Sequence, residues 1–279
     1  MENGKTHWFS DNKANWNNRA ALHEASGYGI EELVANPDAV SPELKQDLFR
    51  FGNLDGKDVI HLQCHLGTDT VGFVRQGARR VVGVDFSDES LRRASIIAKR
   101  CGHSIEFVES NVYDAREAIE GDFDLVYTSL GVLCWLPDVS KWAKVVASFL
   151  KRGGSFFIRD DHPMFMTIGD DVSNGLKIED PYFEQNEPQS WDFDGSYVAA
   201  DENVPRVTNT VSHQWNHSLG EVISALINAG LCIDKVEETP FSAWCPWPGL
   251  MTQTNDGRWR LTDSPERVPM QFVIEAHKP

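Results

Sequence analysis

The sequence predicts an α/β fold in which short buried strands alternate with amphipathic helices. Residues 59–85 carry the clearest unit: an apolar strand, a tight loop, a helical stretch that stops at Gly77, and a β-branched strand that ends in Asp85. The alternation continues through helical patterns at 88–100 and 137–150 to an apolar strand at 155–159. A doubly wound sheet with helices on both faces accounts for this order.

The unit at 59–85 also predicts a ligand. A strand-loop-helix-strand unit places a helix N-terminus beside the loop and an acidic side chain one strand away. This geometry suits an adenosine-type ligand, because the acid accepts hydrogen bonds from ribose hydroxyls. The glycine pattern G-x-G-x-x-G of dinucleotide-binding proteins is absent, which argues against a nicotinamide-dependent oxidoreductase.

Composition narrows the classes of partner. The chain has 279 residues, of which 41% are hydrophobic and 24% charged, as in a globular protein. A net charge of −16 argues against nucleic acid or an anionic membrane as the main partner, because both attract clustered Lys and Arg. The five cysteines show no paired spacing, and no signal peptide or membrane-spanning run is apparent, so we expect a cytoplasmic protein.

The first 57 residues are expected to be helical. Residues 7–25 show helical spacing, with Asp11 as a candidate N-cap, and Ser41-Pro42 is expected to begin another helix. Two interpretations of the first helix remain open: it covers one edge of the sheet, or its Trp16 and Arg19 close over a bound ligand.

Three further patterns follow in order. Ser87 is a candidate N-cap for the helix at 88–100, and the strand at 105–108 leads to Asn111. The strand F-D-L-V-Y-T-S at 123–129 is followed by L-G-V-L-C-W-L-P-D, and an L-K-R-G-G turn at 150–154 precedes the strand at 155–159. Asn111 is either a turn-forming residue or an acceptor for an adenine amino group.

These motifs together resemble class I S-adenosylmethionine (SAM)-dependent methyltransferases, in a bacterial branch that acts on small molecules or has no assigned substrate. The resemblance covers residues 58–162 well and resumes at the helix ending in A-G-L and at the closing P-M-Q-F-V-I-E-A-H. It departs at the loop after the first strand, where the positions of the usual D-x-G-x-G-x-G hold His61, Gln63, His65 and Gly67, so that only the last glycine is kept. The resemblance implies seven strands in the order 3-2-1-4-5-7-6, with the seventh antiparallel.

The resemblance also implies SAM as the cofactor and a site for it. The residues expected to line that site are Trp16, Arg19, Gln63, Cys64, His65, Gly67, Asp85, Phe86, Ser87, Asn111, Val112, Ser129 and Leu130. With two glycines lost, the side chains of Gln63 and His65 are expected to touch the methionine end of the cofactor, and Gly67 to allow close backbone approach.

We expect one domain over residues 1–279, with a SAM-binding core at 58–160, a cover at 161–211 and the end of the sheet at 212–279. The cover region is acidic and contains interspersed aromatic residues, so it is either a solvated extension or a lid over a pocket. As a lid, its rings from Phe165 to Tyr197, together with those at 241–247, would wall a pocket for a small acceptor. Its acids would then lie outside, because unpaired buried carboxylates are costly.

Methyl transfer from a sulfonium is an in-line displacement that depends mainly on alignment. His162 is the candidate base if the acceptor carries a proton, and His213 and His217 are weaker candidates. No metal is expected, because His61 and His65 splay apart without a second ligand pair. The expected protein is a small-molecule methyltransferase, monomeric or homodimeric. The alternative is a SAM-binding protein without catalytic activity.

Overall fold

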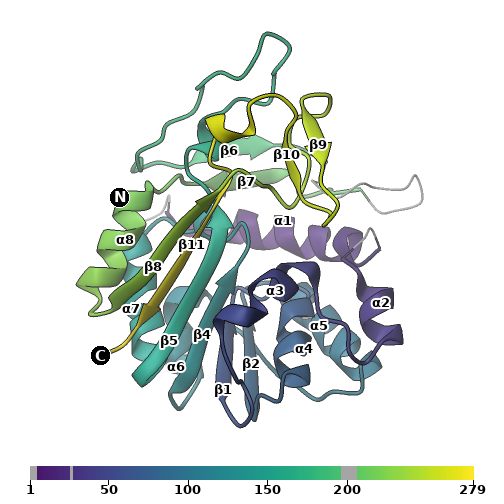
Figure 1. The fold of residues 1–279 in the computed structure, drawn as a ribbon, viewed down its shortest axis with the longest axis vertical. Coiled ribbons are helices and arrows are strands. Elements are labelled where there is room, and N and C mark those ends of the chain that lie inside the picture. Colours follow the sequence, from purple (N-terminus) through teal and green to yellow (C-terminus); the bar gives the residue numbers. More distant parts are fainter. Residues whose placement is uncertain (1–4, 26–27, 196–205) are drawn as a thin grey trace.

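The computed structural model describes residues 5–25, 28–195 and 206–279, and a seven-stranded mixed sheet forms its centre (Figure 1). The strands lie in the order β3-β2-β1-β4-β5-β11-β8, and β11 runs antiparallel to both β5 and β8. Their bounds are β1 Asp58–Leu62, β2 Arg80–Asp85, β3 Glu106–Glu109, β4 Phe123–Ser129, β5 Leu150–Asp161, β8 Cys232–Thr239 and β11 Gln271–His277. The order predicted from the sequence, with its antiparallel seventh strand, is confirmed.

Helices cover both faces of this sheet. One face carries α3 (Pro42–Asp47), α4 (Thr68–Arg75) and α5 (Asp88–Arg100), and the other carries α6 (Ala115–Ala118), α7 (Val139–Phe149) and α8 (Leu219–Asn228). Every residue of β1 is buried, as expected for a central parallel strand between two helical layers. Short 3₁₀ turns join the elements: η1 Leu48–Arg50, η2 Val112–Asp114, η3 Leu133–Trp135, η4 Phe165–Thr167 and η5 Pro265–Arg267.

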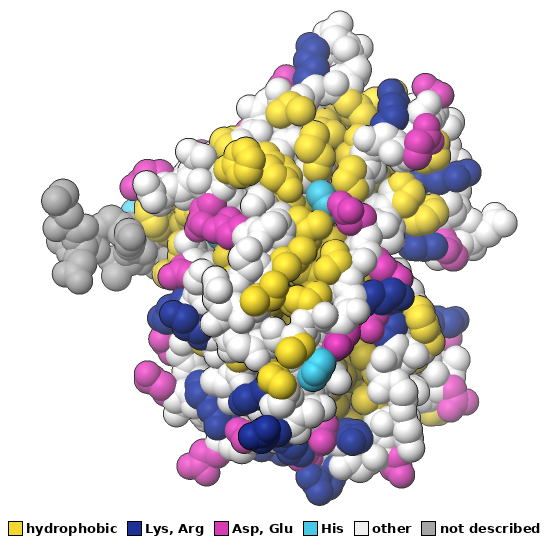
Figure 2. Space-filling view, turned by 60° about the vertical axis from the view of Figure 1, so that its left-hand side comes forward, with side chains coloured by type: hydrophobic (Ala, Val, Ile, Leu, Met, Phe, Trp, Pro, Cys, Tyr) yellow, Lys and Arg dark blue, Asp and Glu magenta, His cyan; other side chains and the backbone are white. Residues whose placement is uncertain are grey.

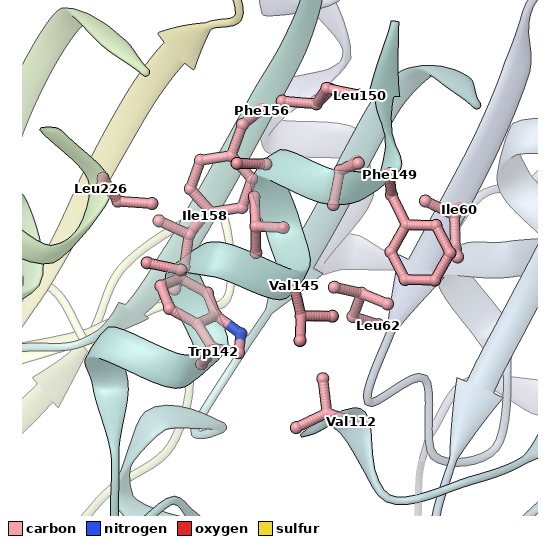
Figure 3. Close-up of a cluster of buried hydrophobic side chains, with 14 of the residues drawn as sticks. Ile60, Leu62, Val112, Trp142, Val145, Phe149, Leu150, Phe156, Ile158 and Leu226 are labelled. Atoms are coloured by element: carbon pink, nitrogen blue, oxygen red, sulfur yellow. The ribbon is translucent and has the colours of Figure 1, made fainter. Parts of the chain in front are cut away.

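The larger core lies between the sheet and the layer of α7 and α8 (Figure 3). The apolar stripe of α7 places Trp142 and Phe149 against the sheet, where the Trp142 ring meets Phe156 edge-on at a centroid distance of 5.6 Å. Leu226 reaches the same cluster from α8. The stripe predicted at 142–150 is therefore the main contact of this helical layer.

Capping residues set where several helices begin. Ser41, Ser87, Asp138 and Ser218 each accept a hydrogen bond from a backbone N–H in the first turn of the following helix. The predicted N-cap at Ser87 is confirmed. The predicted N-cap at Asp11 is wrong, because α1 (Lys5–Ala25) begins earlier and Asp11 instead contacts His213 Nε2 at 3.0 Å.

A second layer lies over the carboxyl ends of the strands. Figure 1 shows α1 crossing between the sheet and two small hairpins, and α2 (Ile30–Ala35) follows it at the side. The hairpins are β6 (Gln189–Asp192) with β7 (Val211–Gln214), and β9 (Met251–Gln253) with β10 (Trp259–Leu261). In the structure the cover consists of these two hairpins and the segment 162–188, so it includes the β9–β10 hairpin in addition to residues from the region expected at 161–211. None of the described helices combines the length and hydropathy needed for a membrane span.

The cover differs from the sequence expectation in its rings. Phe165 and Trp247 pack in a buried cluster with Met251, Leu261 and Met270. By contrast, Phe183 and Phe193 are 71% and 57% exposed, so the prediction that they wall a pocket is wrong. Figure 2 shows hydrophobic side chains on the surface of the upper half of the molecule, interspersed with acidic ones. Tyr197 lies outside the described residues.

A buried ion-pair network ties the N-terminal helices to the sheet. Asp47 at the end of α3 accepts two hydrogen bonds of 2.7 Å from Arg159 of β5, and their side chains are 1% and 5% exposed. Arg50 also bonds Asp47, and reaches Glu237 of β8 and Glu275 of β11. The guanidinium groups thus join α3 and η1 to three adjacent strands.

We predict that Asp47→Asn lowers the free energy of unfolding by about 3–5 kcal/mol, because it leaves the buried charge of Arg159 without its partner. Urea denaturation of wild type and variant measures this change. Asp122→Asn, which breaks the exposed Asp122–Arg116 pair, is the control and should cost less than about 1 kcal/mol. Equal effects of the two substitutions would contradict the prediction.

Candidate cofactor and acceptor site

The loop between β1 and α4 has a left-handed backbone at three positions. Gln63, His65 and Gly67 have φ angles of 59°, 47° and 68°. Only glycine adopts this region without strain, and other residues pay about 1–2 kcal/mol each. The loop therefore keeps the backbone that glycines would allow, although two of the three positions carry large side chains.

Asp85 at the end of β2 holds this loop. Its Oδ2 accepts a hydrogen bond of 2.8 Å from the His65 N–H, and its Oδ1 accepts one of 2.9 Å from the Ser87 N–H. Burial raises the pKa of Asp85 to about 6, so the group is mainly ionised at neutral pH. A carboxylate offers about four lone-pair sites, which leaves acceptor capacity for ligand hydroxyls.

The side chain of His65 is packed under α1. Its Nδ1 is 3.0 Å from Ser90 Oγ, and its Nε2 is 2.9 Å from His23 Nδ1. The Trp16 ring meets the imidazole edge-on at 5.0 Å. Burial lowers the pKa of His65 to about 3 and that of His23 to about 2, so both rings are neutral. Helix α1 thus packs over the loop through Trp16.

Gly67 is required by packing as well as by its φ angle. A Cβ added there would lie 3.0 Å from the ring of Phe107 and 3.2 Å from Ala94 Cβ. The close approach in this structure is therefore to β3 and α5.

Two buried polar atoms at the loop have no hydrogen-bond partner among the described residues. They are the Gln63 carbonyl oxygen Oε1 and the Trp16 indole Nε1. The Gln63 amide nitrogen donates to the Val132 carbonyl at 3.1 Å, which fixes the side chain between two loops. Arg19 lies nearby on α1, is 9% exposed and donates to Asn15. An unpaired buried acceptor on the loop and an unpaired buried donor on α1 suit a ligand that carries both kinds of group.

Other residues expected at the site use their side chains elsewhere. The Asn111 side chain caps η2 by accepting from the Tyr113 N–H, and Ser87 caps α5 while donating to Asn17 at 2.6 Å. Val112 is buried in the main core. These residues can therefore bind a ligand only through backbone atoms or through hydrogen-bonding sites that their side chains do not already use.

The remaining expected residues lie at strand ends. The Cys64 thiol is buried next to Gly83 of β2, and burial raises its pKa well above the usual range. Ser129 donates to Asp69 at 3.0 Å and accepts from Tyr127. Phe86 and Leu130 are half-buried at the carboxyl edge of the sheet.

Sequence reasoning missed the residue that shapes the loop after β4. Asp160 at the end of β5 accepts hydrogen bonds from the backbone N–H groups of Gly131, Val132 and Leu133. Its side chain is buried, so the expectation that the acids near this position face outward is wrong for Asp160. A carboxylate directly after a buried strand was the available signal. The sequence does not predict its burial, because a buried acid costs energy unless backbone donors surround it, and these donors come from a different loop.

A small cavity lies beside this loop, under the cover. Its volume is about 20 Å³, and it is lined by residues that include Asp161, Pro163, Met166, Asn216 and His217. This is room for about one water. Asp161 Oδ1 has no hydrogen-bond partner among the described residues, and burial beside Asp160 raises the pKa of Asp161 to about 8.

The histidines expected as bases are hydrogen-bonded here. His162 Nδ1 accepts from the Met164 N–H at 3.0 Å, so the proton sits on Nε2, which donates to Glu238 at 2.7 Å. Neither nitrogen of His162 is free to accept a proton in this arrangement. His213 bridges Ser190 and Asp11.

The comparisons with known proteins agree with this geometry. Residues 60–156 match a family model described as a methyltransferase domain. The chain is also 32% identical over 110 residues to the ubiquinone biosynthesis O-methyltransferase of Sodalis glossinidius, a match that covers 39% of this chain and 43% of that protein. The chain thus matches less than half the length of this curated relative.

Solved structures give the fold. A SAM-dependent methyltransferase from Mesorhizobium loti superposes with a TM-score of 0.57 at 23% identity, covering 87% of this chain and 100% of that chain. The magnesium protoporphyrin IX methyltransferase of Synechocystis, solved with bound S-adenosylhomocysteine (SAH), superposes with a TM-score of 0.51 at 16% identity, covering 85% of this chain and 84% of that one. The protein therefore has the class I methyltransferase fold. The matched domain and this fold agree with the resemblance of its motifs to SAM-dependent methyltransferases.

The strain at Gln63 can be measured by two substitutions. Gln63→Ala and Gln63→Gly both remove the hydrogen bond to Val132, but only glycine relieves the left-handed backbone. We predict that the glycine variant is more stable than the alanine variant by about 1 kcal/mol. Chemical denaturation of both variants measures the difference, and an alanine variant as stable as the glycine variant would contradict it.

Proposed function

We propose that the protein is a SAM-dependent methyltransferase that acts on a small molecule. The observation that carries this proposal is the left-handed loop at 63–67, held by Asp85 beside the N-terminus of α4 at the carboxyl edge of the sheet. Ligands of open α/β folds bind at this edge. The matches to a methyltransferase domain and to SAM-dependent methyltransferase structures support the same function.

The residues at the loop fit the groups that SAM carries. Asp85 has acceptor capacity for the ribose hydroxyls. The unpaired Gln63 Oε1 suits the methionyl ammonium, and the unpaired Trp16 Nε1 suits the carboxylate. When bound, SAM supplies an electrophilic methyl group on a sulfonium. The residues of the protein then have to align that methyl group with an acceptor and exclude water.

The acceptor is proposed to bind at the cavity lined by Asp161 and His217, between the loop after β4 and the cover. The Gln63–Val132 hydrogen bond links this loop to the proposed cofactor site, so the two sites are adjacent. A cavity of about 20 Å³ admits no organic acceptor, so the cover must move before an acceptor can enter. An enclosed site and a net charge of −16 favour a small molecule over nucleic acid.

We assign Asp161 the role of base for an acceptor that carries a proton, such as a hydroxyl. Its Oδ1 has no hydrogen-bond partner among the described residues, and its pKa of about 8 makes the carboxylate available to accept a proton in slightly alkaline solution. The proton of the acceptor would move to this carboxylate as the new bond to the methyl group forms.

A cytoplasmic location is also proposed, since all five cysteines are unpaired, as in a reducing compartment.

The cofactor assignment is tested by calorimetry with SAH. Asp85→Asn removes the charge that strengthens hydrogen bonds to the ribose, so we expect binding to weaken by about 1.5–3 kcal/mol. Glu106→Gln is the control, because it removes a carboxylate at the amino end of β3, away from the carboxyl edge where the loop lies. Absence of SAH binding by wild type, or equal affinity in the Asp85 variant, would contradict the assignment.

The base is tested by the pH dependence of methyl transfer to a panel of small phenols. Asp161 is protonated below its pKa of about 8 and cannot accept a proton there. We therefore expect the wild-type rate to rise with pH and level off above pH 8. Asp161→Asn should lower the rate by about 10²–10⁴-fold and remove this dependence, with unchanged SAH affinity. His162→Gln serves as the comparison; loss of the pH profile in that variant instead would identify His162 as the base.

A further inference from the structure

Three side chains converge where the cover meets the N-terminus of α8. Glu184 comes from the cover, His217 from the link between β7 and α8, and Glu221 from the first turn of α8. One ligand atom of each lies within 4.8 Å of the others. His217 Nδ1 is 3.7 Å from Glu184 Oε1 and 3.8 Å from Glu221 Oε2.

The protonation of His217 is fixed by its other nitrogen. Nε2 lies 2.6 Å from the Leu136 carbonyl oxygen, which can only accept, so Nε2 carries a proton. The side chain is 1% exposed, and Nδ1 has no hydrogen-bond partner among the described residues. A buried imidazole that donates one N–H to a backbone carbonyl and presents the other nitrogen is typical of a metal-ligating histidine.

The distances around Nδ1 also suit a cation. Separations of 3.7 and 3.8 Å are too long for hydrogen bonds. Ligands bound to one cation at roughly 2.0–2.2 Å are themselves separated by roughly 3–4 Å. The two carboxylates bring negative charge to one point, and both glutamate side chains are 30% exposed, which leaves an entry path and room for water ligands.

We propose that Glu184, His217 and Glu221 bind a divalent transition-metal cation such as Zn²⁺ or Mn²⁺. One imidazole nitrogen and two carboxylate oxygens suit these ions, and the imidazole disfavours Ca²⁺ and Mg²⁺. The cation joins the cover, through Glu184, to α8 and to the residue that lines the small cavity. It therefore acts as a clamp that holds the cover against the sheet domain, whether or not the protein transfers methyl groups.

The sequence does not predict this site, because the clustered histidines that it presents as candidate ligands are His61 and His65. In the structure, His61 Nδ1 is bonded to Thr70 and His65 is bonded to His23 and Ser90. The His217–Glu221 spacing is one helical turn, but Glu184 is brought to it only by the fold of the cover.

The first test is calorimetry with Zn²⁺, and separately with Mn²⁺, on the full chain after treatment with a chelator. We expect one high-affinity site, with tighter binding of Zn²⁺ than of Mn²⁺. Glu184→Gln and Glu221→Gln should each weaken binding at least tenfold, and thermal melting without metal checks that both variants fold. Glu187→Gln is the matched control, because it removes an exposed carboxylate from the same segment. Wild-type affinity in both Glu184 and Glu221 variants, or an equal loss in the Glu187 variant, would overturn the site.

The second test measures the clamp itself. Trypsin can cleave after Lys177, an exposed residue of the cover. We expect Zn²⁺ to slow this cleavage in wild type and in Glu187→Gln, but not in Glu184→Gln. Equal cleavage of the wild-type chain with and without Zn²⁺ would overturn the clamp.

Discussion

The contact between the Asp85 carboxylate and the backbone of the loop after β1 is the interaction on which the candidate site depends. It holds His65 in a left-handed conformation that a non-glycine residue adopts only at a cost of about 1–2 kcal/mol. A hydrogen bond to a charged acceptor contributes about 1.5–3 kcal/mol, enough to offset this strain. The His65 side chain then becomes the surface on which Trp16 and His23 of α1 pack.

A second carboxylate does the same for the neighbouring loop. Asp160 gathers the backbone N–H groups after β4, and Gln63 joins the two loops by donating to the Val132 carbonyl. The loops that would hold the cofactor and the acceptor are thus connected through one side chain. A change in the conformation of either loop has to be accommodated by the other.

The packing of the cover separates two kinds of aromatic residue that look alike in the sequence. Phe165 and Trp247 are buried together, with ring centroids 5.4 Å apart, whereas Phe183 and Phe193 face solvent. Composition alone gave the same expectation for all four. Their burial depends on how these irregular segments pack against one another, and a segment without regular periodicity does not reveal this.

The sequence by itself determined the alternation of strands and helices and the start of α5 at Ser87, because buried strands, caps and apolar stripes are local patterns. The order of the strands followed from the resemblance of its motifs to class I methyltransferases. The sequence also placed Gln63, His65 and Asp85 at strand ends on one edge. The tertiary structure alone decided how their hydrogen bonds are used, because a donor and its acceptor far apart in the chain meet only after folding.

His162 and His217 show this limit most clearly. Both follow strands and carry the same imidazole, so the sequence offered both as bases. In the fold, His162 bonds Met164 and Glu238 through its two nitrogens, whereas His217 keeps one buried nitrogen without a hydrogen-bond partner among the described residues. Local sequence fixes which groups a residue carries. Only the packing of distant segments fixes which of its atoms find partners, and therefore which remain available to a ligand.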